Sequence, residues 1–117
     1  MRALVVDDHG VMRAGLRSLL ESRDDVTLVG EAKNGEEAIE QAERLKPELI
    51  LMDIELPGLS GILAAEEITR QQYCDRILML SAHETCNFVE SALRAGARGY
   101  VVKTSSAQEL QTAIDAV

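Results

Sequence analysis

Three short, continuous apolar segments constrain the fold of this chain more than any other feature. They are Ala3–Val6, Leu49–Met52 and Ile77–Leu80. Runs of this length without a polar interruption are typical of strands buried on both faces of a sheet. Two further segments, Val26–Glu31 and Gly99–Val102, mix apolar and polar residues, as strands at the edges of a sheet do. The sequence therefore predicts five strands, of which the second and fifth are peripheral.

Helical patterns separate the predicted strands and continue after the last one. Asn34, Ser60 and Ser106 are placed to cap the second, third and fifth helices, and Gly96 is placed to end the fourth. Apolar residues recur at helical spacing in every one of these segments. They are Met12, Leu16, Leu19 and Leu20, then Ala38, Ala42 and Leu45, then Ala64, Ala65 and Ile68, then Phe88, Val89, Ala92 and Leu93, and finally Leu110, Ala113, Ile114 and Val117.

The strict alternation of strand and helix, repeated five times, predicts the fold class. Such a pattern indicates an α/β (βα)5 fold, a doubly wound parallel sheet with helices on both faces and right-handed crossovers. Peripheral second and fifth strands fit the strand order 2-1-3-4-5, because that order places the first, third and fourth strands in the middle of the sheet. In a sheet of this order the ligand crevice lies beyond the carboxyl ends of the first and third strands. We find no repeat or composition shift, so residues 1–117 are predicted to form one domain.

The charge balance limits the partners that this chain can attract. Twelve Lys and Arg against twenty Asp and Glu give a net charge of −8. An acidic excess of this size repels nucleic acid and anionic lipid, so we expect neither direct DNA binding nor membrane association. The apolar run after Met1 and Arg2 is too short for a signal peptide or a membrane span. We therefore expect a cytoplasmic location.

Acidic side chains follow two neighbouring strands of the predicted sheet. Asp7 and Asp8 come directly after the first strand, and Asp53 follows the third. Because the carboxyl ends of these strands meet at one crevice, three carboxylates are expected to converge there. Like charges this close oppose each other's ionisation unless a cation lies between them. Mg2+, which prefers oxygen ligands and retains several waters, suits such a site.

Further groups that suit phosphate chemistry lie at the same predicted edge. Lys103 follows the fifth strand and Ser81 follows the fourth. Taken singly, each residue has a structural explanation, since strand-end acids often cap helices and either Asp8 or His9 could start the first helix. Together, a carboxylate nucleophile at Asp53, a metal, an ammonium and a hydroxyl are the parts needed to accept a phosphoryl group.

Four segments of the chain occur in the order and spacing of a known family. They are Val5–His9, Leu51–Pro57 with Gly61 beyond it, Leu80–Ala82 and Ala95–Lys103. With these segments the chain resembles the receiver domains of bacterial two-component response regulators over essentially its whole length. The Asp-Asp-His opening, the Gly-Glu-Ala stretch and the Gly-Ala-Arg-Gly-Tyr segment are most similar to the NarL/FixJ-like class. The resemblance implies a flavodoxin-like fold.

The resemblance also implies a phosphoacceptor site. Asp53 would be phosphorylated by a partner sensor histidine kinase in a reaction that requires Mg2+ as cofactor. The metal ligands would be the carboxylates of Asp8 and Asp53 and the backbone carbonyl of Glu55, with Asp7 acting through a bound water.

A switch is the second implication of the resemblance. Lys103 would pair with the acyl phosphate, and Ser81 would turn inward to bind a phosphate oxygen. Tyr100 would follow from an exposed to a buried position, changing the surface of the fourth helix, fifth strand and fifth helix and promoting a homodimer. Without the resemblance, the alternative explanation of Tyr100 is a partly exposed aromatic residue on an edge strand.

Two features concern the immediate surroundings of the site. Many receivers have a cis proline after the lysine, whereas Thr104 follows Lys103 here, so this bond is either a strained cis bond or trans. Glu55 and His83 lie two residues after Asp53 and Ser81. With the resemblance, these positions would flank the route of an attacking water. We expect them to tune the lifetime of the acyl phosphate, and unchanged dephosphorylation rates in Glu55→Ala and His83→Ala would refute this.

The resemblance implies a helix-turn-helix effector domain downstream of the receiver. We expect this chain to be the receiver part of a transcription regulator that contacts DNA only through that domain, although a natural single-domain receiver is the alternative. We do not expect an enzyme acting on external substrates.

Three other functions are less favoured by the residues. A haloacid dehalogenase-type phosphatase needs an acid two residues after its nucleophile, where this chain has His9. A nucleotide- or flavin-binding module needs a glycine- or hydroxyl-rich first turn, and this turn is acidic. A receiver-like module that is never phosphorylated would have lost Asp53 or Lys103, and both are present.

Overall fold

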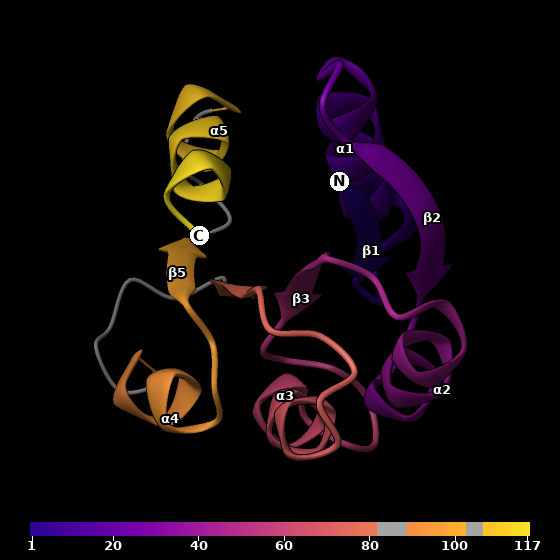
Figure 1. Ribbon diagram of the computed structural model, residues 1–117, viewed down its shortest axis with the longest axis vertical. Coiled ribbons are helices and arrows are strands. Elements are labelled where there is room, and N and C mark those ends of the chain that lie inside the picture. Colours follow the sequence, from indigo (N-terminus) through magenta and orange to yellow (C-terminus); the bar gives the residue numbers. More distant parts are fainter. Residues whose placement is uncertain (82–88, 103–106) are drawn as a thin grey trace.

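The computed structural model describes residues 1–81, 89–102 and 107–117 (Figure 1). In these ranges the strands form one parallel sheet in the order β2-β1-β3-β4-β5. The strands are β1 (Arg2–Val6), β2 (Thr27–Ala32), β3 (Leu49–Asp53), β4 (Ile77–Ser81) and β5 (Gly99–Val102). The predicted strands and their order are confirmed, with β2 starting and ending one residue later than expected.

The helices form a layer on each side of the sheet. They are α1 (Gly10–Glu21), α2 (Gly35–Leu45), α3 (Gly61–Arg70), α4 (Val89–Arg94) and α5 (Ala107–Ala116). Figure 1 shows α1 and α5 on one face of the sheet and α2, α3 and α4 on the other. The fold is therefore the doubly wound, flavodoxin-like architecture that the alternating pattern predicts.

The core is divided into two aliphatic layers by the pleat of the strands. In β1, Ala3 and Val5 pack under α1 and α5, whereas Leu4 and Val6 pack under α2, α3 and α4. This alternation follows from the two-residue period of a strand. All residues of β3 and β4 are buried, whereas those of β5 are only half-buried. The predicted division into central and peripheral strands is confirmed.

Local signals in the sequence fix several of the helix ends. The Asn34 side chain accepts a hydrogen bond from the Glu37 amide at 2.8 Å, and Ser60 accepts one from Leu63 at 3.2 Å. Gly96, with φ of +105°, follows α4 in a left-handed conformation that favours glycine. The expected cap at Ser106 lies outside the described residues.

The prediction for one position of α4 is wrong. Leu93 was assigned to the apolar stripe of this helix, but it is 53% exposed. The helix contacts the core through Ala92, which is fully buried, and adjacent residues on a helix point about 100° apart. Because the helix approaches the core through alanine, its neighbour Leu93 is turned toward solvent. Phe88 lies outside the described residues.

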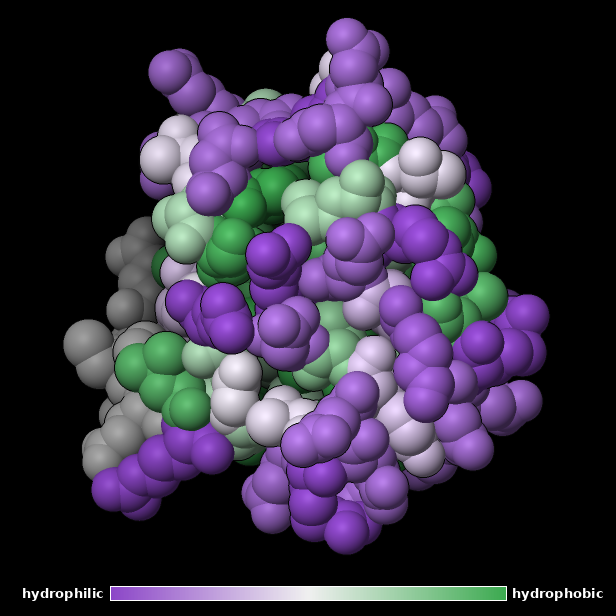
Figure 2. All heavy atoms as spheres, viewed as in Figure 1, coloured by the Kyte–Doolittle hydropathy of each residue, from purple (hydrophilic) through white to green (hydrophobic). Residues whose placement is uncertain are grey.

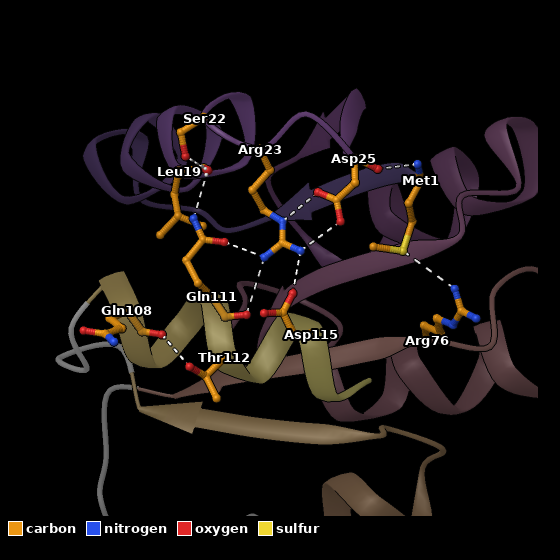
Figure 3. A network of polar contacts seen from close by, with 10 residues as sticks. All are labelled: Met1, Leu19, Ser22, Arg23, Asp25, Arg76, Gln108, Gln111, Thr112 and Asp115. Carbon is orange, nitrogen blue, oxygen red and sulfur yellow. Dashed lines mark hydrogen bonds and ion pairs between the residues drawn. The ribbon is translucent and has the colours of Figure 1, made fainter.

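A polar network joins the end of α1 to the last helix (Figure 3). The Arg23 guanidinium contacts the Asp115 carboxylate at 2.6 Å, the Gln111 side-chain oxygen at 2.6 Å and both Asp25 oxygens at 3.0 Å. The Gln111 amide in turn donates to the Leu19 carbonyl at 3.4 Å. These contacts raise the pKa of Arg23, chiefly through Asp25, and the hydrogen bond from Arg23 lowers the pKa of Asp25. The network fixes α5 against α1.

The surface is mainly hydrophilic on the face shown in Figure 2. Large hydrophobic side chains that are more than half exposed in the described residues are Val11, Leu63 and Leu93. Within the described ranges, no helix combines the length and apolar character needed to cross a membrane.

Candidate functional site

Four side chains with metal-ligating atoms meet at the carboxyl edge of the sheet. Asp7, Asp8 and His9 follow β1, and Asp53 is the last residue of β3. One ligand atom from each of these residues lies within 4.8 Å of the others. The predicted convergence of the three carboxylates is therefore observed.

The register of the sheet explains why these acids meet. Val6 at the end of β1 pairs with Met52 of β3. Asp7 and Asp53 are the next residues along these two strands, so they lie beside each other at the carboxyl edge. The Asp7 amide also donates to the carbonyl of Ala32 at the end of β2, at 3.1 Å. Asp7 thus continues the ladder by one bond beyond β1 before the chain turns into α1.

The three carboxylates differ in their access to solvent. Asp7 is fully buried and Asp53 is 1% exposed, whereas the Asp8 side chain is 32% exposed. Two unit charges 4.8 Å apart, the outer limit of the cluster, repel by roughly 3 kcal/mol at an effective dielectric constant of 20. A divalent cation with oxygen ligands offsets that cost, and a site with few protein ligands and one open side suits Mg2+. The donor set therefore fits a hard divalent metal ion.

His9 belongs to the same cluster and also begins α1. It occupies the N-cap position, which settles the choice between Asp8 and His9, although its side chain makes no capping bond. Its amide donates to Asp7 Oδ1 at 2.9 Å, and its Nδ1 lies 3.1 Å from Asp7 Oδ1 and 3.2 Å from Asp8 Oδ1. The imidazole therefore lies at the surface and is a polar neighbour of both carboxylates.

The loop after β3 holds the Asp53 carboxylate in place. The amide of Glu55 donates to Asp53 Oδ1 at 2.9 Å, while the Glu55 side chain is exposed. Gly61, at the start of α3, packs directly on the Asp53 carbonyl, and a Cβ atom there would collide with it. The Gly61 amide donates to the Ile54 carbonyl at 2.9 Å. The absence of a side chain at Gly61 thus lets α3 begin immediately beside the site.

The remaining predicted residues are only partly within the described chain. Ser81 is fully buried at the end of β4, one position beyond Leu80, which pairs with Asp53. Tyr100 is half-buried on β5 and packs against the core layer under α2, α3 and α4. Lys103, its bond to Thr104, and His83 lie outside the described residues, so their predicted roles remain predictions.

Sequence reasoning gave no role to Arg13, which contacts the main chain of the site. Its NH1 group donates to the carbonyl of Asp7 at 2.8 Å, and its Nε lies 3.6 Å from Glu31 Oε1. A signal was present in the sequence, because a cation in the first turn of a helix opposes the helix dipole. Such a residue usually has a specific acceptor nearby.

Cys74 is excluded as a competing nucleophile. Its thiol is free and buried, and desolvation by burial raises its pKa to about 11. A thiol that stays protonated at neutral pH is a poor nucleophile.

Comparison with known proteins places this geometry in a family. Residues 3–115 match the response regulator receiver domain family. The chain is 38% identical to the nitrate/nitrite response regulator protein NarL of Escherichia coli over 111 residues, covering 95% of this chain and 51% of NarL. It is also 38% identical to the transcriptional regulatory protein LiaR of Bacillus subtilis over 116 residues, covering 99% of this chain and 55% of LiaR.

Solved structures support the same assignment. A two-component response regulator of the LuxR family from Aurantimonas superposes with a TM-score of 0.92 at 39% identity, covering 98% of this chain and 82% of that one. The chain spans about half the length of the curated relatives that it matches. The chain belongs to the receiver domain family of two-component response regulators.

Proposed function

We propose that this chain is a phosphorylation-dependent signalling switch in which Asp53 accepts a phosphoryl group from a sensor histidine kinase. One observation carries the proposal: a nearly fully buried carboxylate ends a central strand and shares a 4.8 Å cluster with two further carboxylates. Membership of the receiver family supports the same function.

The metal site of this proposal uses the residues at the carboxyl edge. Mg2+ would be held by the carboxylates of Asp8 and Asp53, by the backbone carbonyl of Glu55 and, through a water, by Asp7. When bound, it supplies positive charge that offsets the charges of the acids and of the phosphoryl oxygens.

The phosphoryl transfer itself uses the Asp53 carboxylate as nucleophile. One carboxylate oxygen forms a bond to phosphorus while the bond from phosphorus to the kinase histidine breaks, and the electron pair leaves with the imidazole nitrogen. The hydrogen bond from the Glu55 amide to Asp53 Oδ1 orients the carboxylate for this attack. Lys103 would pair with the acyl phosphate, and the Ser81 hydroxyl would bind one of its oxygens.

The output of the switch would be a change in surface. The phosphate contacts made by Ser81 favour one of two preexisting states, and Tyr100 moves from its half-buried position to a buried one. The surface of α4, β5 and α5 changes with it and favours a homodimer. A DNA-binding effector domain attached to the receiver would then regulate transcription, as the names of LiaR and its relatives suggest.

The chemistry proposed for the chain is confined to its own phosphoryl group. It accepts that group and later loses it to water, so it is not an enzyme that turns over external substrates. The exposed Glu55 side chain, close to Asp53, is proposed to influence the rate of hydrolysis, together with His83. Comparing the dephosphorylation rates of Glu55→Ala and His83→Ala with the wild-type rate tests this part.

The central experiment is intact-mass analysis after incubation with Mg2+ and acetyl phosphate. We expect one added phosphoryl group in the wild type, and none when a chelator is present in excess. The Asp53→Asn variant should remain unmodified. Asp24→Asn, which changes an exposed acid at the opposite edge of the sheet, should be modified like the wild type and serves as the matched control.

The alternative outcomes separate competing functions. A folded wild-type protein that binds Mg2+ but gains no phosphoryl group from acetyl phosphate or from sensor kinases would be an interaction module with a receiver fold. Modification that persists in Asp53→Asn would show that another residue is the acceptor and would contradict the proposal.

A further inference from the structure

Arg13 occupies a position that helix electrostatics alone does not favour. It lies in the first turn of α1, where the helix dipole disfavours cations. Its side chain is nevertheless only 19% exposed, so the guanidinium is held against the protein and does not extend into solvent. The acceptors that hold it there explain its position.

The main acceptor of Arg13 is the peptide group that joins the two acids of the site. The carbonyl of Asp7, which receives the 2.8 Å hydrogen bond from Arg13 NH1, lies in the same planar unit as the amide of Asp8. Rotation of this unit would change the directions in which the Asp7 and Asp8 side chains leave the backbone. A donor fixed on its carbonyl therefore fixes the relative orientation of the two carboxylates.

The other contacts of Asp7 complete its restraint. Its amide donates to Ala32 at 3.1 Å, and its Oδ1 atom accepts from the His9 amide at 2.9 Å. Arg13 adds the restraint on the carbonyl, so the amide, the carbonyl and the Oδ1 atom of Asp7 each have a described contact. Of these donors, only Arg13 reaches the site through a long side chain, which makes its contribution separable by substitution.

Arg13 is itself held in place from the second strand. Its Nε lies 3.6 Å from Glu31 Oε1, and Arg17 NH1, one turn further along α1, lies 3.2 Å from Glu31 Oε2. The two arginines thus share one carboxylate. Only the contacts of Arg13 continue from Glu31 to the carbonyl of Asp7.

We propose that Arg13 is a positioning residue for the metal site, acting through the peptide between Asp7 and Asp8. The inference rests on the proposed function, because it assumes that these carboxylates bind Mg2+. Held by Glu31 and bonded to the Asp7 carbonyl, the guanidinium keeps the two carboxylates in the arrangement that the metal requires.

A purely electrostatic role for Arg13 predicts the opposite result. A positive charge near the site repels a divalent cation, so removing it should strengthen Mg2+ binding. Positioning predicts instead that removing Arg13 weakens binding, because the carboxylates must then be ordered by the metal itself. The sign of the change in affinity therefore distinguishes the two roles.

The test compares Arg13→Met with Arg17→Met in the same chain. Both variants remove one charge next to Glu31, but only the first removes the donor to Asp7. Titration with MgCl2, followed in 1H–15N spectra, gives the dissociation constant and shows whether the fold is intact. We expect Arg13→Met to bind Mg2+ about three- to tenfold more weakly, the size of one lost hydrogen bond of ordinary net strength. Arg17→Met should bind as tightly as the wild type or slightly more tightly.

Arg13→Lys is a milder variant, in which a change in Mg2+ affinity can be measured even if Arg13→Met fails to fold. Arg13→Lys retains the charge but lacks the planar fork that reaches both acceptors, so an intermediate affinity is expected. Equal or tighter binding by Arg13→Met, or equal weakening in the two methionine variants, overturns the inference while leaving the metal site standing. Absence of Mg2+ binding in the wild type overturns both the inference and the proposed metal site.

Discussion

Arginine and aspartate have opposite roles at the two ends of the strands. The end at which the strands begin is the amino edge of the sheet, and the end at which they finish is the carboxyl edge. At the amino edge, Arg23 lies between Asp25 and Asp115, and the two carboxylates are 63% and 65% exposed. At the carboxyl edge, Asp7 and Asp53 are almost completely buried and lie close to a further carboxylate.

The difference separates a structural use of charge from a functional one. At the amino edge, the exposed carboxylates of Asp25 and Asp115 are both matched directly by Arg23, and this network joins α1 to α5 (Figure 3). At the carboxyl edge, Arg13 bonds to a carbonyl of the site and pairs with Glu31, while the clustered carboxylates are the donor set proposed to hold Mg2+. We therefore expect substitutions at the amino edge to change stability alone, and removal of a clustered carboxylate at the carboxyl edge to change stability and metal binding in opposite directions.

The largest effect is expected from Asp8→Asn. Removing one of three clustered charges should lower the Mg2+ affinity roughly tenfold or more, because a charged oxygen ligand is lost. The same change should raise the free energy of unfolding without metal by about 1–2 kcal/mol, since repulsion is relieved. Thermal unfolding with and without Mg2+ measures both, because a ligand that binds the folded state raises its melting temperature.

If Mg2+ raised the melting temperature of Asp8→Asn as much as that of the wild type, this prediction would be contradicted. Asp24→Asn, an exposed acid near Arg23, is the control and should leave the metal-dependent shift as it is in the wild type. If instead both variants lost the shift, general surface charge would explain the binding better than the local cluster.

The sequence predicted the fold well because the relevant signals are local. Uninterrupted runs such as Leu49–Met52 identify the buried strands, and the cap at Asn34 fixes the start of α2. Leu93 was misassigned because apolar spacing cannot show which side of a short helix approaches the sheet. That choice is made by packing of Ala92 and Ala95 against the core, which is a tertiary effect.

The acids of the site were predictable, but the contacts that orient them were not. Asp7, Asp8 and Asp53 follow strands whose order could be inferred, so their convergence could be inferred too. The bond from Arg13 to the Asp7 carbonyl joins a helix side chain to a main-chain atom, and it depends on how α1 lies over the sheet. Glu31 participates because β2 pairs with β1 after a shift in register near Leu4, which the residue pattern did not indicate.

A moderate effect on stability alone is expected from Arg23→Met. The variant loses the hydrogen bonds and ion pairs to Asp25, Gln111 and Asp115, but the two carboxylate partners are largely exposed and screened by solvent. We expect a decrease in the free energy of unfolding of about 1 kcal/mol, measured by urea denaturation. The Mg2+ affinity should equal that of the wild type. A weaker affinity would show that the two edges of the sheet are coupled through α1.

The smallest expected effect is the pH dependence of the stability that the amino edge contributes, and it follows from the pKa of Asp25. The hydrogen bond from Arg23 lowers this pKa in the folded protein relative to the unfolded chain. A carboxyl of this kind stabilises the fold above its unfolded pKa, about 3.9, and the contribution is lost as the pH falls through the lower, folded value. Wild type should therefore exceed Asp25→Asn in unfolding free energy at pH 5, and the difference should shrink when the pH is lowered to 3.

The matched control for this titration is the neighbouring exposed acid. Asp24→Asn should not show the same pH-dependent difference from wild type, because the Asp25 side chain, which Arg23 contacts at 3.0 Å, is retained. Raising the ionic strength should reduce the Asp25 effect, since the Asp25 carboxylate is 63% exposed. A difference between wild type and Asp25→Asn that stays constant from pH 5 to pH 3 would mean that packing, and not the charge on Asp25, joins the amino edge to α5.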